Sequence, residues 1–188
     1  MTGEHEVIRR KDTSGPLQFR PAGAKDVARV VALVESAYRG DASRVGWTTE
    51  ADFLQGRRTG PDDIESILAN PDARLLLAER GGELIACANI AVEAGEGYFG
   101  MFSVRPEIQG AGLGSLVLAE AERIVAQEWG CRKMRMTVID IREDLIPFYE
   151  RRGYQRTGIK KPFPYGDARF GIPLRDDLRF EVLEKQLP

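Results

Sequence analysis

Three patterns in the sequence predict an α/β or α+β protein that is built on one central sheet. Apolar runs at 74–79, 83–92 and 97–104 follow one another closely, which predicts a β-meander. Helical periodicity precedes this meander at 26–38 and follows it at 112–129. Strands and helices in this order pack as a sheet that is covered by helices.

The elements before the meander are indicated by local signals. Residues 17–20 are expected to form a short strand that Pro21 closes. Asp26 stands where the N-cap of the first helix belongs. Residues 47–52 are expected to begin another helix, because a threonine that can cap is followed three positions later by an aspartate. Pro61 and the two carboxylates after it predict the start of a further helix.

The elements from the meander onward follow the same logic. The Gly81-Gly82 pair predicts a tight hairpin between the first two meander strands. Beyond the helix at 112–129 the pattern predicts a strand at 133–139, a short helix at 145–152, a strand from 154, a loop at 162–177 and a last strand at 178–183.

The composition is that of a globular protein, with 43% hydrophobic and 30% charged residues. A chain of 188 residues is long enough for one domain with a substantial core. Residues 1–16 are mostly polar and predict a flexible leader, which assigns residues 17–188 to a single domain.

Charge and rare residue types exclude several functions. The 27 Lys and Arg residues nearly balance 29 Asp and Glu residues, so neither nucleic acid nor an anionic membrane is an expected partner. No apolar run is long enough to span a bilayer, and a cytoplasmic location is expected. Only two cysteines, Cys87 and Cys131, and one histidine, His5, are present, so no metal site is expected.

The most specific feature is the glycine-rich segment 109–115, which lies between a strand that ends at Val104 and a strongly patterned helix. Alternating glycines allow backbone N–H groups to converge, and a helix N-terminus adds partial positive charge, so the segment suits a phosphate group. A Walker A loop is excluded because no lysine occurs between 110 and 132. A dinucleotide fingerprint is excluded because Ser115 stands where the third glycine belongs. A glycine-rich turn without a ligand is the alternative.

Two segments resemble the GNAT superfamily of N-acetyltransferases. The first is Tyr98–Pro106 followed by Gln109-Gly110-Ala111-Gly112-Leu113-Gly114, which is similar to the acetyl-CoA motif of that family. The second is Phe148-Tyr149-Glu150-Arg151-Arg152-Gly153-Tyr154, which is similar to its second hallmark. The resemblance implies a mixed, mostly antiparallel sheet of six to seven strands flanked by helices.

The resemblance also implies how acetyl-CoA would be held as co-substrate. Backbone amides of the loop would bind the diphosphate, and these belong to Gln109, Gly110, Ala111, Gly112, Leu113, Gly114 and Ser115. The pantetheine arm would lie beside Phe102, Ser103 and Val104. Arg142 stands where many members have an asparagine that contacts the pantetheine, and its side chain could pair with a phosphate or with Glu143 or Asp144.

Tyr149 matches the tyrosine that protonates the departing thiolate in this family, although packing alone could explain an aromatic residue on a short helix. The acceptor amine must lose a proton, and no histidine is placed for this. Glu50 is the expected base, with Asp41 and Asp167 as alternatives. Tyr38, Trp47 and Tyr165 are expected to line the acceptor site.

These observations predict an enzyme that transfers acetyl from acetyl-CoA to a primary amine of a small molecule by direct attack. A protein N-terminus or lysine is the alternative acceptor. A sensor that binds acyl-CoA without catalysis is the alternative from another class. The habits of the family suggest a homodimer that forms through the C-terminal strand.

Overall fold

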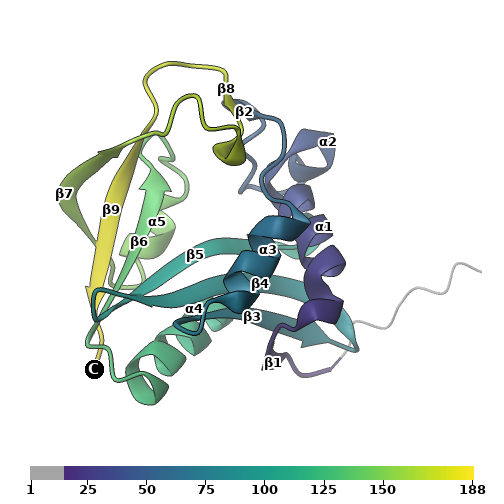
Figure 1. Cartoon of the computed structure of the whole chain (residues 1–188), viewed down its shortest axis with the longest axis vertical. Coiled ribbons are helices and arrows are strands. Elements are labelled where there is room, and N and C mark those ends of the chain that lie inside the picture. The colour runs from purple at the N-terminus through teal and green to yellow at the C-terminus, as the bar shows by residue number, and fades with distance from the viewer. Residues whose placement is uncertain (1–14) are drawn as a thin grey trace, which may run out of the picture.

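The computed structural model describes residues 15–188, so the predicted leader lies almost wholly outside the described residues. The described chain forms a seven-stranded sheet in the order β1-β3-β4-β5-β6-β9-β7 and a separate two-stranded sheet of β2 and β8 (Figure 1). Only the β5–β6 pair in the large sheet is parallel. The predicted mixed, mostly antiparallel sheet flanked by helices is confirmed.

The bounds of the elements agree closely with the periodicities in the sequence. The strands are β1 Gln18–Pro21, β2 Leu54–Gln55, β3 Ala73–Arg80, β4 Glu83–Glu93, β5 Glu96–Val104, β6 Lys133–Ile139, β7 Gln155–Pro162, β8 Ile172–Pro173 and β9 Arg179–Gln186. The helices are α1 Val27–Tyr38, α2 Gly40–Ser43, α3 Pro61–Ala69, α4 Leu113–Arg123 and α5 Ile146–Glu150. A π-helical segment, η3 Ile124–Glu128, continues α4 toward Trp129.

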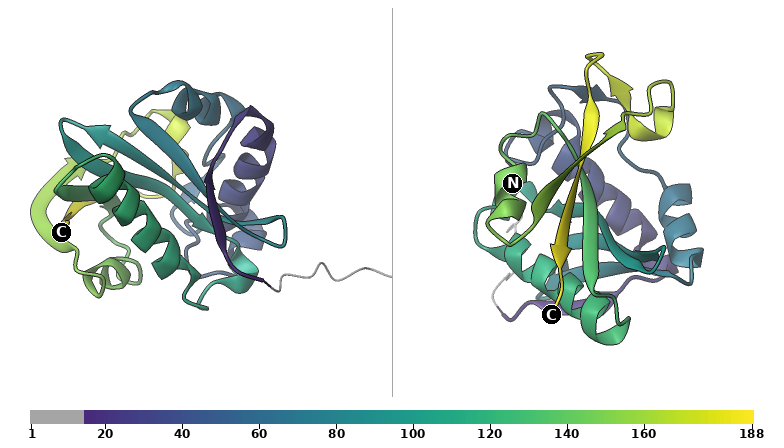
Figure 2. Two further views of the ribbon diagram at one scale, coloured as in Figure 1. Left: turned by 90° about the horizontal axis from the view of Figure 1, so that it is seen from below. Right: turned by 90° about the vertical axis from the view of Figure 1, so that its left-hand side faces the viewer.

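The meander strands have continuously apolar sequences because helices cover both faces of the sheet (Figure 2). Side chains alternate between the faces of a strand. In β3, Leu75 and Leu77 pack in the cluster that contains α1 and α3 residues. Leu76 and Ala78 pack on the other side, in the cluster that contains α4 residues. The helices therefore fix β3, β4 and β5 as a rigid layer.

The parallel pair β5–β6 separates after two residues. Gly97 pairs with Met134 and Tyr98 pairs with Arg135, and no later pair joins the two strands. Met101 has a φ of 46°, and the register of β4 against β5 shifts between Cys87 and Asn89, so a bulge turns the second half of β5 away. The result is the opening between β5 and β6 that Figure 1 shows.

The segment 47–52 differs from its prediction. It forms no helix, because the backbone makes only a single turn in which the N–H groups of Phe53 and Leu54 donate to the carbonyl of Glu50. Thr49 instead accepts from the N–H of Ala51 and lies 2.6 Å from the hydroxyl of Ser43. Burial of the Glu50 carboxylate opposite a guanidinium overrides the local helix signal.

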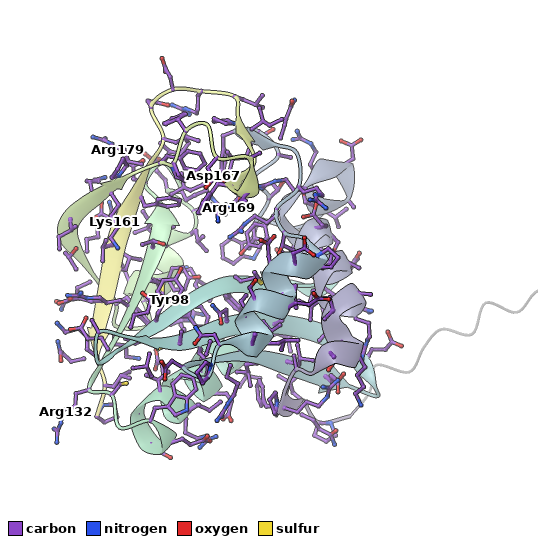
Figure 3. The ribbon with its side chains drawn as sticks, in the orientation of Figure 1. Tyr98, Arg132, Lys161, Asp167, Arg169 and Arg179 are labelled. Atoms are coloured by element: carbon purple, nitrogen blue, oxygen red, sulfur yellow. The ribbon has the colours of Figure 1, made fainter. Side chains whose placement is uncertain are left out.

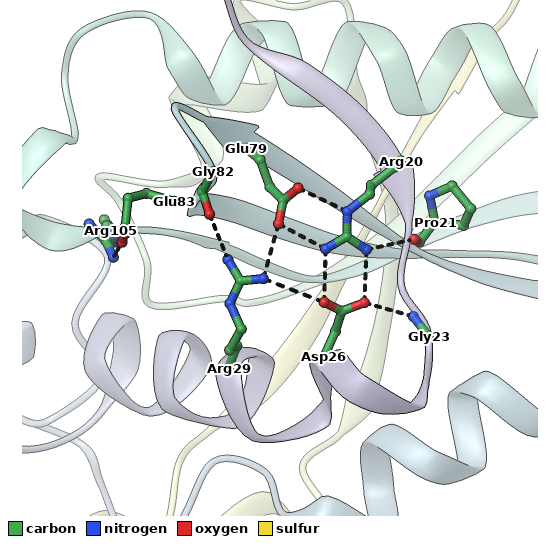
Figure 4. A network of polar contacts seen from close by, with 9 residues as sticks. All are labelled: Arg20, Pro21, Gly23, Asp26, Arg29, Glu79, Gly82, Glu83 and Arg105. Carbon is green, nitrogen blue, oxygen red and sulfur yellow. Dashed lines mark hydrogen bonds and ion pairs between the residues drawn. The ribbon is translucent and has the colours of Figure 1, made fainter. Parts of the chain in front are cut away.

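Asp26 is the N-cap residue of α1, as predicted, but its side chain makes no cap hydrogen bond to that helix. A 3₁₀ turn, η1 Ala24–Asp26, precedes α1, so Asp26 is the third residue of the helical segment and its carboxylate accepts from the N–H of Gly23. Both carboxylate oxygens also accept from Arg20 at 2.8 Å. Glu79 accepts from the same guanidinium, and Arg29 joins the two carboxylates (Figure 4). This network ties β1 and the start of α1 to β3.

We expect Asp26→Asn to lower the free energy of unfolding by about 2 kcal/mol at pH 7. Asp26 is 1% exposed, and the hydrogen bonds from Arg20 lower the pKa of its carboxyl to about 2. A lowered pKa stabilises the fold above the pKa of the unfolded chain, near 4, and that stabilisation is lost as the pH falls toward 2. Urea unfolding at pH 7 and pH 3 measures it, with exposed Glu65→Gln as the control; an equal loss at both pH values contradicts the assignment.

Candidate active site

The second half of β5 presents one open edge toward β6. The N–H and C=O of one strand residue point to the same edge, and the N–H of Arg105 donates to Ile85 on β4, so Phe102 and Val104 face the opening. The backbone carbonyls of Phe102 and Val104 already accept hydrogen bonds from two side chains. The Tyr38 hydroxyl donates to the carbonyl of Phe102, and Gln109 Nε2 donates to the carbonyl of Val104 at 2.9 Å. The N–H groups of Phe102 and Val104 are left to face the opening.

The glycine loop ends in the first turn of α4. Gly110 and Gly112 have φ values of 89° and 77°, and Gly112 is the N-cap of the helix. Among residues 15–188, no acceptor is present for the backbone N–H groups of residues 110 to 112. The first amides of α4 add further donors without a helical partner. The loop therefore concentrates N–H groups and positive helix-dipole charge at one point.

The side chain of Gln109 fixes the loop against the segment 46–48. Its Oε1 accepts from the N–H of Trp47 at 2.9 Å, and its Nε2 donates to Thr48 Oγ1 at 2.9 Å. A Cβ at Gly46 would lie 2.6 Å from Oε1, so a larger residue there would displace the Gln109 side chain. The Gln109 side chain is thus fully used inside the protein, and any contact with a ligand falls to the backbone of the loop.

A cavity of about 280 Å³ runs from the loop to the open edge of β5. Its lining combines the loop, the segment at Trp47, the open strand and the start of α5, namely Tyr38, Trp47, Thr48, Phe102, Val104, Gln109, Gly110, Gly112, Gly114, Ser115, Leu145, Phe148, Tyr149 and Arg152. Two other loop residues are not part of this lining: the Leu113 side chain is buried in the core and Ala111 is exposed, and the contacts predicted for both are through the backbone. Ser103 is buried beside β4 rather than on the lining.

Arg152 is a site residue that the sequence analysis missed. Its guanidinium lies 3.6 Å from the centre of the Phe148 ring and donates from two nitrogens to Ser115 Oγ and from a third to the carbonyl of Phe148. No carboxylate of the described chain pairs with it. Burial, with Arg151 nearby, lowers the pKa of this guanidinium. The signal in the sequence was a second consecutive arginine next to the tyrosine motif.

A second, smaller cavity of about 130 Å³ lies between the separated strands β5 and β6. Tyr38, Phe102, Leu145 and Tyr149 line both cavities, so they mark the junction. Tyr149 is 4% exposed, and burial raises the pKa of its phenol well above the ordinary value. The phenol is therefore protonated throughout the neutral range.

Charged groups surround the far side of the smaller cavity. Glu50 is 8% exposed, and its Oε2 lies 2.5 Å from Arg39 Nη1 and 3.8 Å from Arg58 Nε. Arg142 also lines this cavity and not the larger one. Its guanidinium donates to both carboxylate oxygens of Asp144 at 2.9 and 3.0 Å, which is the pairing alternative that the sequence left open.

The remaining predicted residues differ in whether they line one of the two cavities. Trp47 packs against Phe148 beside the glycine loop, on the larger cavity. Tyr165 lines neither cavity, because its hydroxyl is used by the backbone of the loop before β9. The side chain of Asp41 is fully exposed. Asp167 pairs with Arg169 on the loop that precedes β8 (Figure 3).

The two thiols offer no nucleophile. Cys87 is completely buried, and burial raises the pKa of its thiol to about 12. Burial also raises the pKa of Cys131. Within residues 15–188, no group of three or more His, Cys, Asp or Glu side chains is placed to hold a metal ion, and no helix is long and apolar enough to cross a membrane.

Residues 33–154 match the model of the acetyltransferase (GNAT) family. The chain belongs to this family. Members of this family use acetyl-CoA, and the unpartnered loop amides are donors that would suit an anionic diphosphate.

Solved structures share the whole architecture at low identity. A protein assigned provisionally as a phosphinothricin N-acetyltransferase is 20% identical with a TM-score of 0.68, covering 92% of this chain and 99% of its own. The ribosomal-protein-alanine N-acetyltransferase from Brucella melitensis is 18% identical with a TM-score of 0.68, covering 90% and 99%. The yncA protein from Salmonella typhimurium, solved with its cofactor acetyl-CoA, is 19% identical with a TM-score of 0.66, covering 92% and 94%. At these identities the likeness concerns the fold.

We expect Gly114→Val to weaken acetyl-CoA binding at least 10-fold and to lower stability by about 1–3 kcal/mol. A Cβ at Gly114 would lie 3.2 Å from the Phe102 ring and 3.3 Å from the Phe148 ring, and both rings line the larger cavity. Calorimetric titration and thermal unfolding measure the two effects. Exposed Ala119→Val on the same helix controls for the branched side chain; unchanged acetyl-CoA affinity in Gly114→Val would show that the rings do not shape the site.

Proposed function

We propose that the protein acetylates a primary amine of a small molecule, with acetyl-CoA as donor, by direct attack of the amine on the thioester. The observation that carries this proposal is the position of Tyr149, which lines both cavities at their junction. A donor bound along β5 and an acceptor between β5 and β6 would meet beside its phenol.

The residues at the junction suit acyl transfer. Acetyl-CoA supplies an activated acetyl group when it is bound. The N–H groups of Phe102 and Val104 face the opening and can donate to an oxygen that gains negative charge. Burial raises the pKa of the Tyr149 phenol, so it keeps its proton at neutral pH and is a proton source for the departing thiolate. Direct attack needs no enzyme nucleophile, which agrees with the burial of Cys87.

Glu50 is our proposed base for the acceptor amine. Of the three candidate carboxylates, Glu50 lines the smaller cavity, whereas Asp41 and Asp167 do not. Arg39 binds its Oε2, and Arg58 Nε lies 3.8 Å from the same oxygen, which leaves Oε1 as the oxygen for a proton or a bridging water. Tyr38 and Arg142 complete this side of the cavity.

The shape of the acceptor side favours a small molecule over a protein substrate. The smaller cavity has a volume of about 130 Å³ and is lined in part by Phe170, which precedes β8. Residues 54–55 and 172–173 pair as β2 and β8. A protein N-terminus or lysine would need an open groove there. A non-catalytic acyl-CoA sensor is disfavoured by the retained phenol, and release of thiol across a panel of amines separates the sensor from the enzyme.

A homodimer through strand pairing would use β7 rather than the last strand. The strand β9 lies between β6 and β7 and is paired on both sides. Residues of β7 are mostly exposed and form an edge of the sheet.

We expect Tyr149→Phe to lower turnover at least about 10²-fold, because the variant cannot protonate the leaving thiolate, while acetyl-CoA affinity is retained. Because burial raises the pKa of Tyr149, we also expect no fall in the turnover of the unmodified enzyme from loss of this proton below about pH 10. Thiol release across the pH range measures both. Tyr154→Phe is the matched control, since its ring contacts Tyr149; equal turnover in both variants would remove Tyr149 as the acid.

We propose that Arg152 binds the CoA diphosphate together with the loop amides, and expect Arg152→Leu to weaken acetyl-CoA binding about 10-fold. The neighbouring exposed Arg151→Leu, which lines neither cavity, is expected to have little effect. S-acetylpantetheine lacks the diphosphate, so its kcat/KM should be the same with and without Arg152. A loss with acetylpantetheine equal to that with acetyl-CoA would assign Arg152 a purely structural role.

A further inference from the structure

One of the three guanidinium groups on the acceptor side makes no hydrogen bond to a carboxylate of the described chain. Three arginines approach the smaller cavity or the charged groups that line it, namely Arg39, Arg58 and Arg142. Of the carboxylates nearby, Glu35 accepts from the backbone N–H groups of Arg58 and Thr59, and two others accept from arginine side chains. Asp144 accepts two hydrogen bonds from Arg142, and Glu50 lies 2.5 Å from Arg39. This pairing leaves Arg58 as the third cation.

The contacts of Arg58 leave its donors available. Its Nε is 3.8 Å from Glu50, a distance that is too long for a hydrogen bond. Within residues 15–188, its guanidinium donates no hydrogen bond, and its side chain is 28% exposed. The guanidinium carbon lies 5.4 Å from the centre of the Tyr38 ring, and a guanidinium over a ring keeps its in-plane N–H groups free.

Hydrogen bonds fix the backbone at Arg58, and its guanidinium lies over the ring of Tyr38. Glu35 on α1 accepts from the backbone N–H groups of both Arg58 and Thr59 through one carboxylate oxygen. Tyr38, the ring beneath the guanidinium, is anchored by its own hydrogen bond to the carbonyl of Phe102. A five-donor cation is thus held at the edge of a small cavity that Tyr149 also lines.

We infer that the acceptor amine carries a carboxylate or a similar anionic group next to the amine, as α-amino acids do, and that Arg58 binds this group. The inference rests on the proposed function and names its substrate class. Glu50 and Arg58 lie on the same cavity with opposite charges and a loose mutual contact. An α-amino acid has its ammonium and its carboxylate on one carbon, so it can place the ammonium toward Glu50 and the carboxylate toward Arg58.

The same charges disfavour other amines. A polyamine would bring several positive charges toward Arg58 without an anion to pair with it. The N-terminus of a peptide has a neutral amide in place of the adjacent carboxylate, so it would leave the guanidinium unpaired. Discrimination of this kind, against an analogue that lacks the group a buried polar site needs, is stronger than discrimination by shape alone.

The test compares matched amines by thiol release with saturating acetyl-CoA. The panel consists of several L-amino acids, their carboxamides, the corresponding decarboxylated amines, a dipeptide and spermidine. We expect kcat/KM for the preferred amino acid to exceed that of its carboxamide by roughly 10- to 100-fold. Arg58→Gln should remove this preference by lowering only the amino-acid value, and Arg58→Lys should keep part of it. Exposed Arg57→Gln should leave the preference intact.

Several outcomes would overturn the inference. These are carboxamides or spermidine that serve as well as amino acids, or an Arg58→Gln variant that loses activity equally with both partners of a matched pair. Acetylation of no member of the panel would also overturn it. Calorimetric titration with acetyl-CoA then tells whether the proposed donor site fails as well. Thermal unfolding and acetyl-CoA affinity of Arg58→Gln confirm that the variant keeps its fold and its donor site.

Discussion

The separation of β5 from β6 is the constraint on which the site depends. A strand that loses its neighbour exposes N–H and C=O groups that must find other partners. Here two side chains satisfy the exposed carbonyls, Tyr38 at Phe102 and Gln109 at Val104. The N–H groups of the same residues remain for a ligand. The edge of β5 therefore stays open to a ligand, while its carbonyls already have hydrogen-bond partners within the protein.

The two partners of this edge also connect the donor and acceptor sides. Gln109 joins the glycine loop to the segment at Trp47 and Thr48, so the loop and the wall of the larger cavity form one hydrogen-bonded unit. Tyr38 spans from α1 to β5, and its ring carries Arg58 on the acceptor side. A displacement of β5 would consequently change the lining of both cavities, because Gln109 and Tyr38 both bind to this strand.

The arginines of the site differ in whether a carboxylate neutralises their charge. Arg152, without a carboxylate partner, lies beside the N-terminus of α4, where positive charge already accumulates. Arg142 is neutralised by Asp144, and Arg39 is buried against Glu50. Arg58 lines the smaller cavity and donates no side-chain hydrogen bond within residues 15–188, whereas Arg39, two of whose nitrogens also lack partners there, is buried away from that lining. The nearly balanced net charge of the chain conceals this local asymmetry, because most charges pair within the surface.

The sheet, its covering helices, the phosphate-type loop and the family could be predicted from the sequence, because they follow from periodicity, from alternating glycines and from residues adjacent in the chain. Other features depend on how distant elements pack. Arg142 pairs with Asp144, Tyr165 lies off both cavities, residues 47–52 form no helix, and Arg58 and Arg152 retain free donors within residues 15–188. The reason is physical. Whether a charged or polar group is satisfied depends on partners from other elements, and no local pattern encodes which distant groups the packing brings within hydrogen-bond distance.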